Sequence, residues 1–278
     1  MMQVWKLLSL SCIFGLMVWG CEKQPVGKPK PVETPTPVEA PKPIETAEPV
    51  KQIKKLPPQK TTEPPRYPRT PVVLQWFGHA SFKIYLNGTN IYIDPWKLKV
   101  EPHNATIVLI SHNHRDHCSV ADIAKVSGPD TKIFATLDVI EETGWGREIK
   151  PGETIELDGV KIVAVAAYNS DTGFHPKDKN WLGFIIEISG KRIYYAGDTD
   201  IIDEMQSLGP IDLALLPVGG TYTMNGMEAA QAVKIIKPKV AIPYHFGDVV
   251  GTLEDAVQFA ENAECGVRVM VPGDKFVL

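Results

Sequence analysis

The segment His112-Asn113-His114-Arg115-Asp116-His117 places four side chains of the kinds that bind metal ions within six positions. It follows a short apolar run, Thr106–Ile110, which is typical of a strand buried on both faces. It precedes a predicted helix, Ser119–Val126, in which Ser119 and Asp122 occupy the positions of a capping box. The cluster therefore lies where a buried strand passes into a helix.

The spacing within this segment predicts how its side chains are shared between ions. In an extended chain, side chains two residues apart point to the same side, so His112 and His114 can hold one ion. The chain then turns, and Asp116 and His117 can face a second ion. Imidazole and carboxylate ligands suit Zn²⁺, Mn²⁺ or Fe²⁺. We therefore predict a site for one or two ions of this kind.

Two further candidate ligands follow predicted strands later in the chain. Asp198 follows the strand Arg192–Ala196, and His245 follows the strand Val240–Tyr244. The carboxyl ends of strands deliver side chains to the edge of a sheet, which is the usual place for sites in α/β proteins. Either residue alone is better explained as a cap or turn residue, but beside the His cluster both are predicted metal ligands.

The remaining pattern predicts a β meander followed by strands mixed with helices. This alternation, with its many hairpins, favours two mixed sheets packed together with helices outside, although periodicity does not distinguish this arrangement from other α/β folds. The expected strands are Val72–Phe77, Ser81–Leu86, Asn90–Ile93, Lys132–Ala135, a pair within Thr154–Ala167, Leu182–Ile188, Lys191–Ala196, Ile211–Leu216 and Val267–Val271, and the later helices are Asn225–Lys237 and Thr252–Ala263.

The motif His-x-His-x-Asp-His, with the later Asp198 and His245, resembles the metallo-β-lactamase superfamily. Other motifs resemble its branch of metal-dependent hydrolases related to ascorbate-6-phosphate lactonase and N-acyl-phosphatidylethanolamine phospholipase D. These motifs are Gly78-His79-Ala80-Ser81-Phe82, Ile93-Asp94-Pro95-Trp96, Tyr195-Ala196-Gly197-Asp198-Thr199-Asp200 and Leu216-Pro217-Val218-Gly219-Gly220-Thr221-Tyr222-Thr223-Met224. The resemblance covers about residues 72–278. It implies a four-layer αββα sandwich with one or two zinc ions at one edge of the sheets.

The resemblance also implies a role for each candidate ligand. His112 and His114 would bind the first ion, and Asp198 would bridge the two. Asp94 would sit behind the ligands and orient them through hydrogen bonds. The second ion would be bound by Asp116, His117 and His245.

The sequence departs from the family pattern after the predicted strand Ile162–Ala167. The family has a further His there, whereas this chain has Tyr168-Asn169-Ser170. We expect His175, a few residues later, to be the third ligand of the first ion. His79, in the Gly-His-Ala turn, is expected either to support the ligands or contact substrate, or to be a structural histidine. Tyr222 and Trp181 are candidates to line the pocket, with ordinary packing as the alternative.

The predicted activity is hydrolysis. Two close cations lower the pKa of a shared water from about 15.7 towards about 7, and the resulting hydroxide can attack a carbonyl or phosphoryl centre. Asp116 or Asp198 could pass the proton to the leaving group. Ester, lactone, amide and phosphodiester bonds in a small molecule or lipid all suit this chemistry. The alternative is a metal-binding envelope lipoprotein without turnover. The chain contains no Gly-x-Ser-x-Gly elbow, Walker loop or dinucleotide fingerprint.

The N-terminus resembles a bacterial lipoprotein signal. Lys6 precedes the apolar run Leu7–Gly20, which is shorter than the roughly 20 residues that a membrane-spanning helix needs. The run ends in Val18-Trp19-Gly20-Cys21. We predict a signal peptide over residues 1–20 and a lipid on Cys21, which would anchor the protein to a membrane of the cell envelope. The alternatives are an uncleaved anchor or a signal cut elsewhere.

Residues 21–70 are predicted to be a disordered, proline-rich linker. Residues 22–71 contain 14 of the 24 prolines, and Pro-Val-Glu or Pro-Ile-Glu recurs every six residues from Pro31. Proline fixes φ and removes backbone donors, so this segment favours an extended tether. The hydrolase domain is expected over residues 71–278. That part carries 18 Lys and Arg against 27 Asp and Glu, a charge of −9, so no nucleic acid partner is expected.

Overall fold

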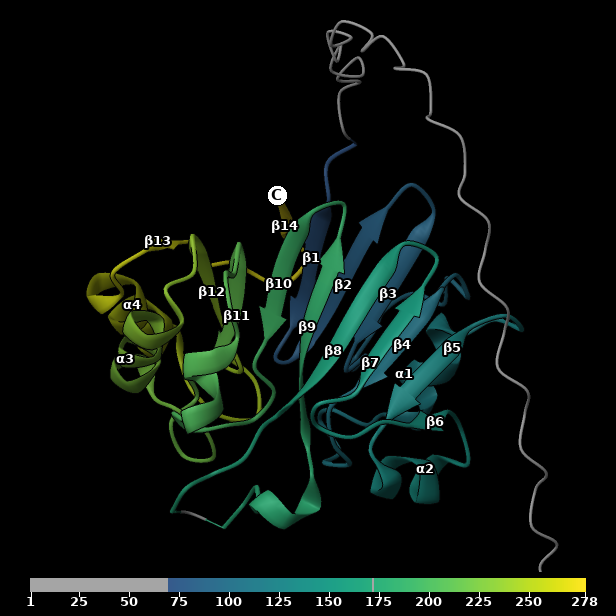
Figure 1. Ribbon diagram of the computed structural model, residues 1–278, viewed down its shortest axis with the longest axis horizontal. Helices are drawn as coiled ribbons and strands as arrows, with labels where there is room; N and C mark the ends of the chain where they lie inside the picture. The colour runs from purple at the N-terminus through teal and green to yellow at the C-terminus, as the bar shows by residue number, and fades with distance from the viewer. Residues whose placement is uncertain (1–69, 172) are drawn as a thin grey trace, which may run out of the picture. The chain divides into compact units, whose positions relative to one another are not determined.

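The computed structural model describes residues 70–171 and 173–278 (Figure 1). The predicted signal peptide, the lipid on Cys21 and the linker, apart from Thr70, lie outside the described residues, so they stay predictions. Within the described ranges, no helix is long and apolar enough to cross a membrane.

Two seven-stranded sheets form the centre of the domain. The order of the first sheet is β14 (Lys275–Val277), β1 (Val73–Gly78), β2 (Ser81–Leu86), β3 (Thr89–Ile93), β4 (Ile107–Ile110), β5 (Lys132–Ala135) and β6 (Arg147–Glu148). The order of the second is β13 (Gly266–Val267), β12 (Val240–Tyr244), β11 (Leu213–Pro217), β10 (Lys191–Tyr195), β9 (Leu182–Ile188), β8 (Val160–Ala166) and β7 (Thr154–Leu157).

Three tight hairpins set the antiparallel half of each sheet. They join β2 to β3, β7 to β8, and β9 to β10, each through two residues. Positive φ at both turn residues matches the right-handed twist of the flanking strands. The turn residues with positive φ are Asn87 and Gly88, Asp158 and Gly159, and Ser189 and Gly190.

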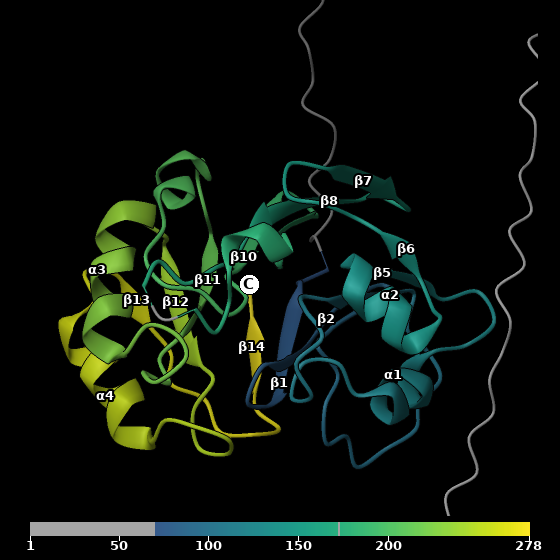
Figure 2. The same ribbon diagram turned by 90° about the horizontal axis from the view of Figure 1, so that it is seen from below.

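Helices cover the outer face of each sheet. Figure 2 shows α1 (Val120–Val126) and α2 (Leu137–Thr143) on one side of the domain, and α3 (Gly226–Ile236) and α4 (Leu253–Asn262) on the other. Two short 3₁₀ helices, Lys177–Lys179 and Asp203–Ser207, lie in loops. A smaller apolar cluster packs α1 and α2 onto the first sheet, and the large core fills the space between the sheets and beneath α3 and α4. The predicted αββα sandwich is confirmed.

The C-terminal end of the chain differs from the prediction. The expected strand Val267–Val271 is wrong, because β13 ends at Val267. The chain instead turns through Pro272 and Gly273, and β14 pairs antiparallel with β1 in the other sheet. The reason is a set of backbone hydrogen bonds made by Trp76, whose N–H donates to Asp274 O at 3.1 Å and whose carbonyl accepts from Gly273 N at 2.7 Å.

Candidate metal centre

The candidate ligands come from the ends of strands in both sheets and meet at one edge. The His112–His117 segment follows β4 of the first sheet. Asp198 and His245 follow β10 and β12 of the second sheet, and His175 lies in the loop between β8 and β9. Gly197 makes the sharp exit from β10 possible, since its φ is +70° and a Cβ there would lie 2.4 Å from the carbonyl oxygen of Leu182.

His112, His114 and His175 form the first group of ligand atoms. One nitrogen of each ring lies within 4.8 Å of the others, and His112 Nε2 is 3.1 Å from His114 Nδ1. The structure thus brings His175 to the place where the sequence analysis expected a third ligand. His175 is held by Asn169, whose Oδ1 accepts from His175 Nδ1 at 2.7 Å. That bond puts the proton on Nδ1 and leaves the lone pair of His175 Nε2 facing the group.

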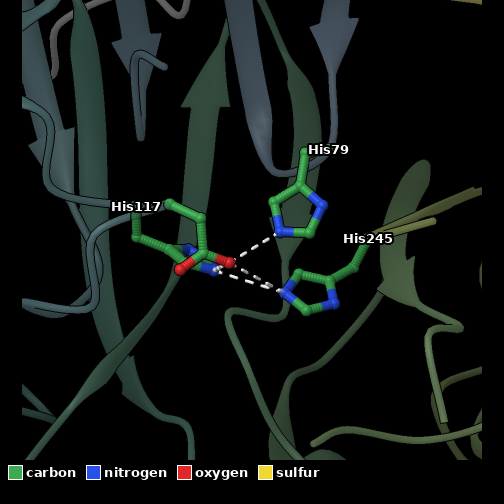
Figure 3. Close-up of side chains that lie close together, drawn as sticks. His79, His117 and His245 are labelled. Carbon is green, nitrogen blue, oxygen red and sulfur yellow. Dashed lines mark hydrogen bonds and ion pairs between the residues drawn. The ribbon is translucent and has the colours of Figure 1, made fainter. Parts of the chain in front are cut away.

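His79, Asp116, His117 and His245 form the second group. Figure 3 shows the rings of His79, His117 and His245 around a common space. His117 Nε2 lies 3.4 Å from His245 Nε2, and Asp116 Oδ2 lies 3.8 Å from each of these nitrogens. His79 Nε2 donates to Asp116 Oδ2 at 2.8 Å. His79 is therefore placed against a candidate ligand, and its role stays a prediction.

Asp198 lies between the two groups. Its Oδ2 is 3.3 Å from His175 Nε2 in the first group. The same oxygen is 3.3 Å from His117 Nε2 and 3.1 Å from His245 Nε2 in the second. One carboxylate oxygen thus faces imidazole nitrogens from both groups, as expected of a bridging residue.

Asp94 supports the second group from behind. Its Oδ2 accepts from His117 Nδ1 at 2.8 Å, so Nε2 of His117 is the free nitrogen that faces Asp198. Asp94 also accepts from the backbone and hydroxyl of Ser111, at 2.8 Å and 2.6 Å, and from Tyr195 Oη at 2.6 Å. The sequence analysis assigned no role to Ser111 or Tyr195. Ser111 directly precedes the His cluster, and this position could have indicated a supporting residue.

Trp181 and Tyr222 have different positions. The Trp181 ring packs 4.7 Å from His112 and 4.8 Å from His114, and its indole N–H donates to Asp138 Oδ2 at 2.7 Å. Trp181 thus packs against the first group and is held by Asp138 of α2. It is not among the residues that line the cavity. Tyr222 does line that cavity, which has a volume of about 370 Å³ and opens onto both groups.

Burial and charge compete in setting the protonation of the cluster. Burial holds the pKa of His112 well below its ordinary value, so this ring is neutral. Burial alone would also lower the pKa of His117, but the carboxylates of Asp198 and Asp94 raise it well above the ordinary value. Burial would raise the pKa of Asp198, but His117 and His245 hold it well below.

The buried polar atoms of the site fit a metal ion. His175 Nε2 and Asp198 Oδ1 are buried and have no hydrogen-bond partner among the described residues. Unpaired buried polar atoms are costly, and a cation that takes lone pairs from some of them relieves that cost. Imidazole nitrogens with carboxylate oxygens are the ligand set that zinc uses in catalytic sites.

Known proteins of similar sequence carry the same domain. The model of the β-lactamase superfamily domain matches residues 73–245. A UPF0173 metal-dependent hydrolase of Thermoplasma volcanium is 36% identical over 215 residues, which are 72% of this chain and 96% of the relative. A UPF0173 metal-dependent hydrolase of Thermococcus onnurineus is 36% identical over 225 residues, which are 73% of this chain and 98% of the relative.

Solved structures agree with these relatives. Igni18, a metallo hydrolase from Ignicoccus hospitalis, has a TM-score of 0.63 at 30% identity, covering 75% of this chain and 99% of Igni18. The metallo-β-lactamase fold protein YhfI from Bacillus subtilis has a TM-score of 0.62 at 14% identity, covering 75% of this chain and all of YhfI, and shares the fold alone. The chain therefore belongs to the β-lactamase superfamily and is a metal-dependent hydrolase of the metallo-β-lactamase fold.

Proposed function

We propose that this protein is a membrane-tethered hydrolase whose His/Asp cluster, with one or two zinc ions bound, cleaves an ester, lactone, amide or phosphodiester bond. The observation that carries the proposal is the position of Asp198 Oδ2, within 3.3 Å of imidazole nitrogens from both groups. A carboxylate oxygen shared by two sets of imidazoles suits two cations held close together. Mn²⁺ and Fe²⁺ accept the same ligands and are the alternatives.

The proposal assigns a task to each part of the cluster. Zinc, when bound, would lower the pKa of water towards about 7 and offset negative charge that develops on a substrate oxygen. Asp94 keeps His117 Nε2 aimed at Asp198 by accepting from Nδ1. The proposed ligands are His112, His114 and His175 for one ion, Asp116, His117 and His245 for the other, and Asp198 for both.

Asp116 is the better placed of the two carboxylates to carry a proton to the leaving group. Both Asp116 and Asp198 line the cavity. The side chain of Asp116 is 18% exposed, whereas that of Asp198 is 3% exposed among three imidazoles. The hydrogen bond from His79 and the charge of His117 outweigh burial and lower the pKa of Asp116, so it is ionised at neutral pH.

Metal analysis combined with a substrate panel tests the activity. The full-length protein in detergent is stripped with a chelator, reloaded with Zn²⁺, Mn²⁺ or Fe²⁺, and assayed on esters, lactones, amides and phosphodiesters. We expect one or two ions per chain and turnover that is lost with the metal. Bound metal without turnover on any member of the panel would favour the alternative, a non-catalytic metal-binding envelope lipoprotein.

The membrane tether is a separate part of the proposal. The apolar run ending at Gly20-Cys21 supports a lipid on Cys21, and the proline-rich residues 22–70 support a spacer between the membrane and the enzyme. The protein would then act in the cell envelope, on the outer side of the cytoplasmic membrane or at the outer membrane, on a small molecule or lipid. The negative charge of residues 71–278 disfavours a nucleic acid substrate.

Labelling with a radioactive fatty acid tests the tether. Wild-type protein should take up the label and sediment with membranes, and Cys21→Ala should do neither. Cys12→Ala is the matched control, because Cys12 has less apolar sequence before it, and this variant should behave as wild type. Uptake and membrane association that survive Cys21→Ala would remove the lipid anchor from the proposal.

A further inference from the structure

Two chemically different sets of side chains line the cavity at the metal centre, and each set is called a wall below. One wall consists of the candidate ligands His114, Asp116, His175, Asp198 and His245. The other consists of Phe174, Tyr222 and Val249.

The second wall is apolar and open to water. Phe174 is 48% exposed and Val249 is 46% exposed. The Phe174 ring meets the Tyr222 ring edge-on, with centroids 4.8 Å apart. Single exposed apolar side chains are ordinary on a protein surface, but here they line one cavity together with the candidate ligands. Burial of these side chains would favour binding most for a substrate that carries an apolar group.

The cavity lacks a protein group suited to an anion. Among the described residues that line it, none is Lys or Arg, and the acidic residues are Asp116 and Asp198. Lys97 is paired with Asp248, the neighbour of Val249, at 2.8 Å. Phosphate groups and distal carboxylates are usually held by Arg, Lys or a helix N-terminus.

Two further groups near the cavity that could bind an anion already have partners. Lys177, two residues after His175, is paired with Glu204 at 3.0 Å. Helix α3 begins shortly after Tyr222, and its capping box already uses the N–H groups of Asn225 and Glu228. A charged substrate group packed against the lining residues would therefore lose its hydration without gaining a cationic side chain there.

We propose, on the basis of the hydrolase function above, that the substrate is an uncharged carboxylic ester or lactone with a small apolar acyl group, and that this group packs against Phe174 and Val249. A volume of about 370 Å³ lies at the small end of ligand pockets, which span about 300 to 1,000 Å³. In the reaction, a bond forms between the water oxygen and the acyl carbon, and the acyl C–O bond breaks. One water proton passes through Asp116 to the leaving oxygen, giving a carboxylic acid and an alcohol.

Two esters with the same reacting bond test the charge preference. The full-length, zinc-loaded protein is assayed on 4-nitrophenyl hexanoate and on the mono-4-nitrophenyl ester of adipic acid, which differ in a terminal methyl or carboxylate. We expect kcat/KM to be about tenfold or more higher for the hexanoate, because the carboxylate is desolvated without a partner. A kcat/KM for the adipate ester, or for bis(4-nitrophenyl) phosphate, equal to or above that for the hexanoate would overturn the inference.

Variants of the apolar wall test the position of the acyl group. Phe174→Ala should lower kcat/KM for the hexanoate about tenfold, mainly through KM, while 4-nitrophenyl acetate is little affected. Phe174→Lys should shift the preference towards the adipate ester. Trp145→Ala is the matched control, since Trp145 is 39% exposed and lies outside the cavity lining. An unchanged chain-length preference in Phe174→Ala would contradict the inference.

Binding to the metal-free protein gives a readout that does not depend on turnover. Ligand-observed NMR should detect 2-octanone, an uncharged ketone, but not 7-oxooctanoate, and Phe174→Ala should weaken the ketone signal. Hydrolysis with the opposite preference would reject this inference and leave the proposed function standing. Absence of hydrolysis of every ester, lactone, amide and phosphodiester by the metal-loaded protein would reject both.

Discussion

Asp198 lies between the two halves of the candidate metal centre. Its Oδ2 contacts His175 of the first group and His117 and His245 of the second. It also places a negative charge where two dications would otherwise repel each other strongly. We expect Asp198→Asn to reduce metal content at both positions and to lower hydrolysis by about three orders of magnitude. Metal counts and turnover of the purified variant measure this.

His245→Ala is the comparison variant for Asp198→Asn, because it removes a candidate ligand from the second group alone. This variant should lose the second ion and keep the first. If Asp198→Asn instead keeps two ions and near-normal turnover, Asp198 is not a bridge, and the two-ion arrangement is wrong.

We propose that His175 takes the place of the histidine that the family has at another position. His175→Ala should lower metal content to nearly the extent that His114→Ala does, because each removes one imidazole from the same group. His103→Ala is the control, since His103 is an exposed loop residue outside the ligand groups. Elemental analysis of the three variants measures their metal content. Zinc content and affinity that stay at the wild-type values in His175→Ala would exclude it from the ligand set.

The loop between β8 and β9 explains how the displaced histidine reaches the site. Asn169 accepts from His175 N at 3.0 Å and from His175 Nδ1 at 2.7 Å. The Asn169 amide donates to Asp200 Oδ1 and to the carbonyl of Tyr222, both at 2.9 Å. The residue at the family's histidine position thus anchors the loop and fixes which nitrogen of His175 is free.

Removal of that anchor should weaken the first metal position without unfolding the domain. We expect Asn169→Ala to lower zinc affinity at the first position about tenfold to a hundredfold, as loss of a supporting hydrogen bond commonly does. Competition with a chromophoric chelator measures the affinity, and circular dichroism verifies the fold. Asn262→Ala, on α4, is the matched control and should bind zinc as wild type does. Equal affinities in the two variants would show that Asn169 does not position His175.

Asp122 joins α1 to the segment that follows β3. Its Oδ2 accepts from Lys97 N and Ser119 Oγ, both at 2.8 Å. Its Oδ1 accepts from Leu98 N at 3.1 Å and Lys125 Nζ at 2.8 Å. Burial alone would raise the pKa of Asp122, but these hydrogen bonds, with that from Lys125 the largest, lower it.

Asp122→Asn should lower the free energy of unfolding by about 1 to 3 kcal/mol at pH 7. The folded pKa lies below the unfolded value of about 3.9, so the carboxylate's contribution is fully present above about pH 4 and is lost as the pH falls through the folded pKa. Urea unfolding should therefore show a constant difference from wild type between about pH 5 and pH 8 that shrinks at lower pH. Asp130→Asn, at an exposed position, should show no difference. A difference that grows as the pH falls would contradict this account.

Every candidate ligand of the domain lies after residue 70, and the large core is built from residues between Val72 and Met270. We therefore expect residues 71–278 to fold and to bind metal without the N-terminal part. Elemental analysis of the truncated protein after reloading with zinc, compared with the full chain, measures this. A folded, soluble truncated protein that retains no transition metal would contradict the prediction.

Most strands could be predicted from the sequence because each is an apolar run that ends at a turn residue. The bounds of Ser81–Leu86, Lys132–Ala135, Leu182–Ile188 and Val240–Tyr244 agree between prediction and structure. Local signals carry this information, since alternation and turn chemistry act within a few residues. Helix α2 was not predicted, because it is short and buries Val139 alone. Strand β14 exists through its pairing with β1, at the opposite end of the domain sequence.

The candidate ligands could be predicted from the sequence, because ligand types and their places after strands are local features. The His112–His117 segment, Asp198 and His245 were found without knowledge of tertiary contacts. The resemblance implied that Asp94 supports these ligands, but the contacts through which they are supported could not be predicted from the sequence. Asp94 and Tyr195 are 101 residues apart and meet because the two sheets pack face to face. Asn169 and His175 meet because the loop after β8 folds back on itself. Such contacts depend on the packing of distant segments, and the sequence near each residue does not encode its distant partner.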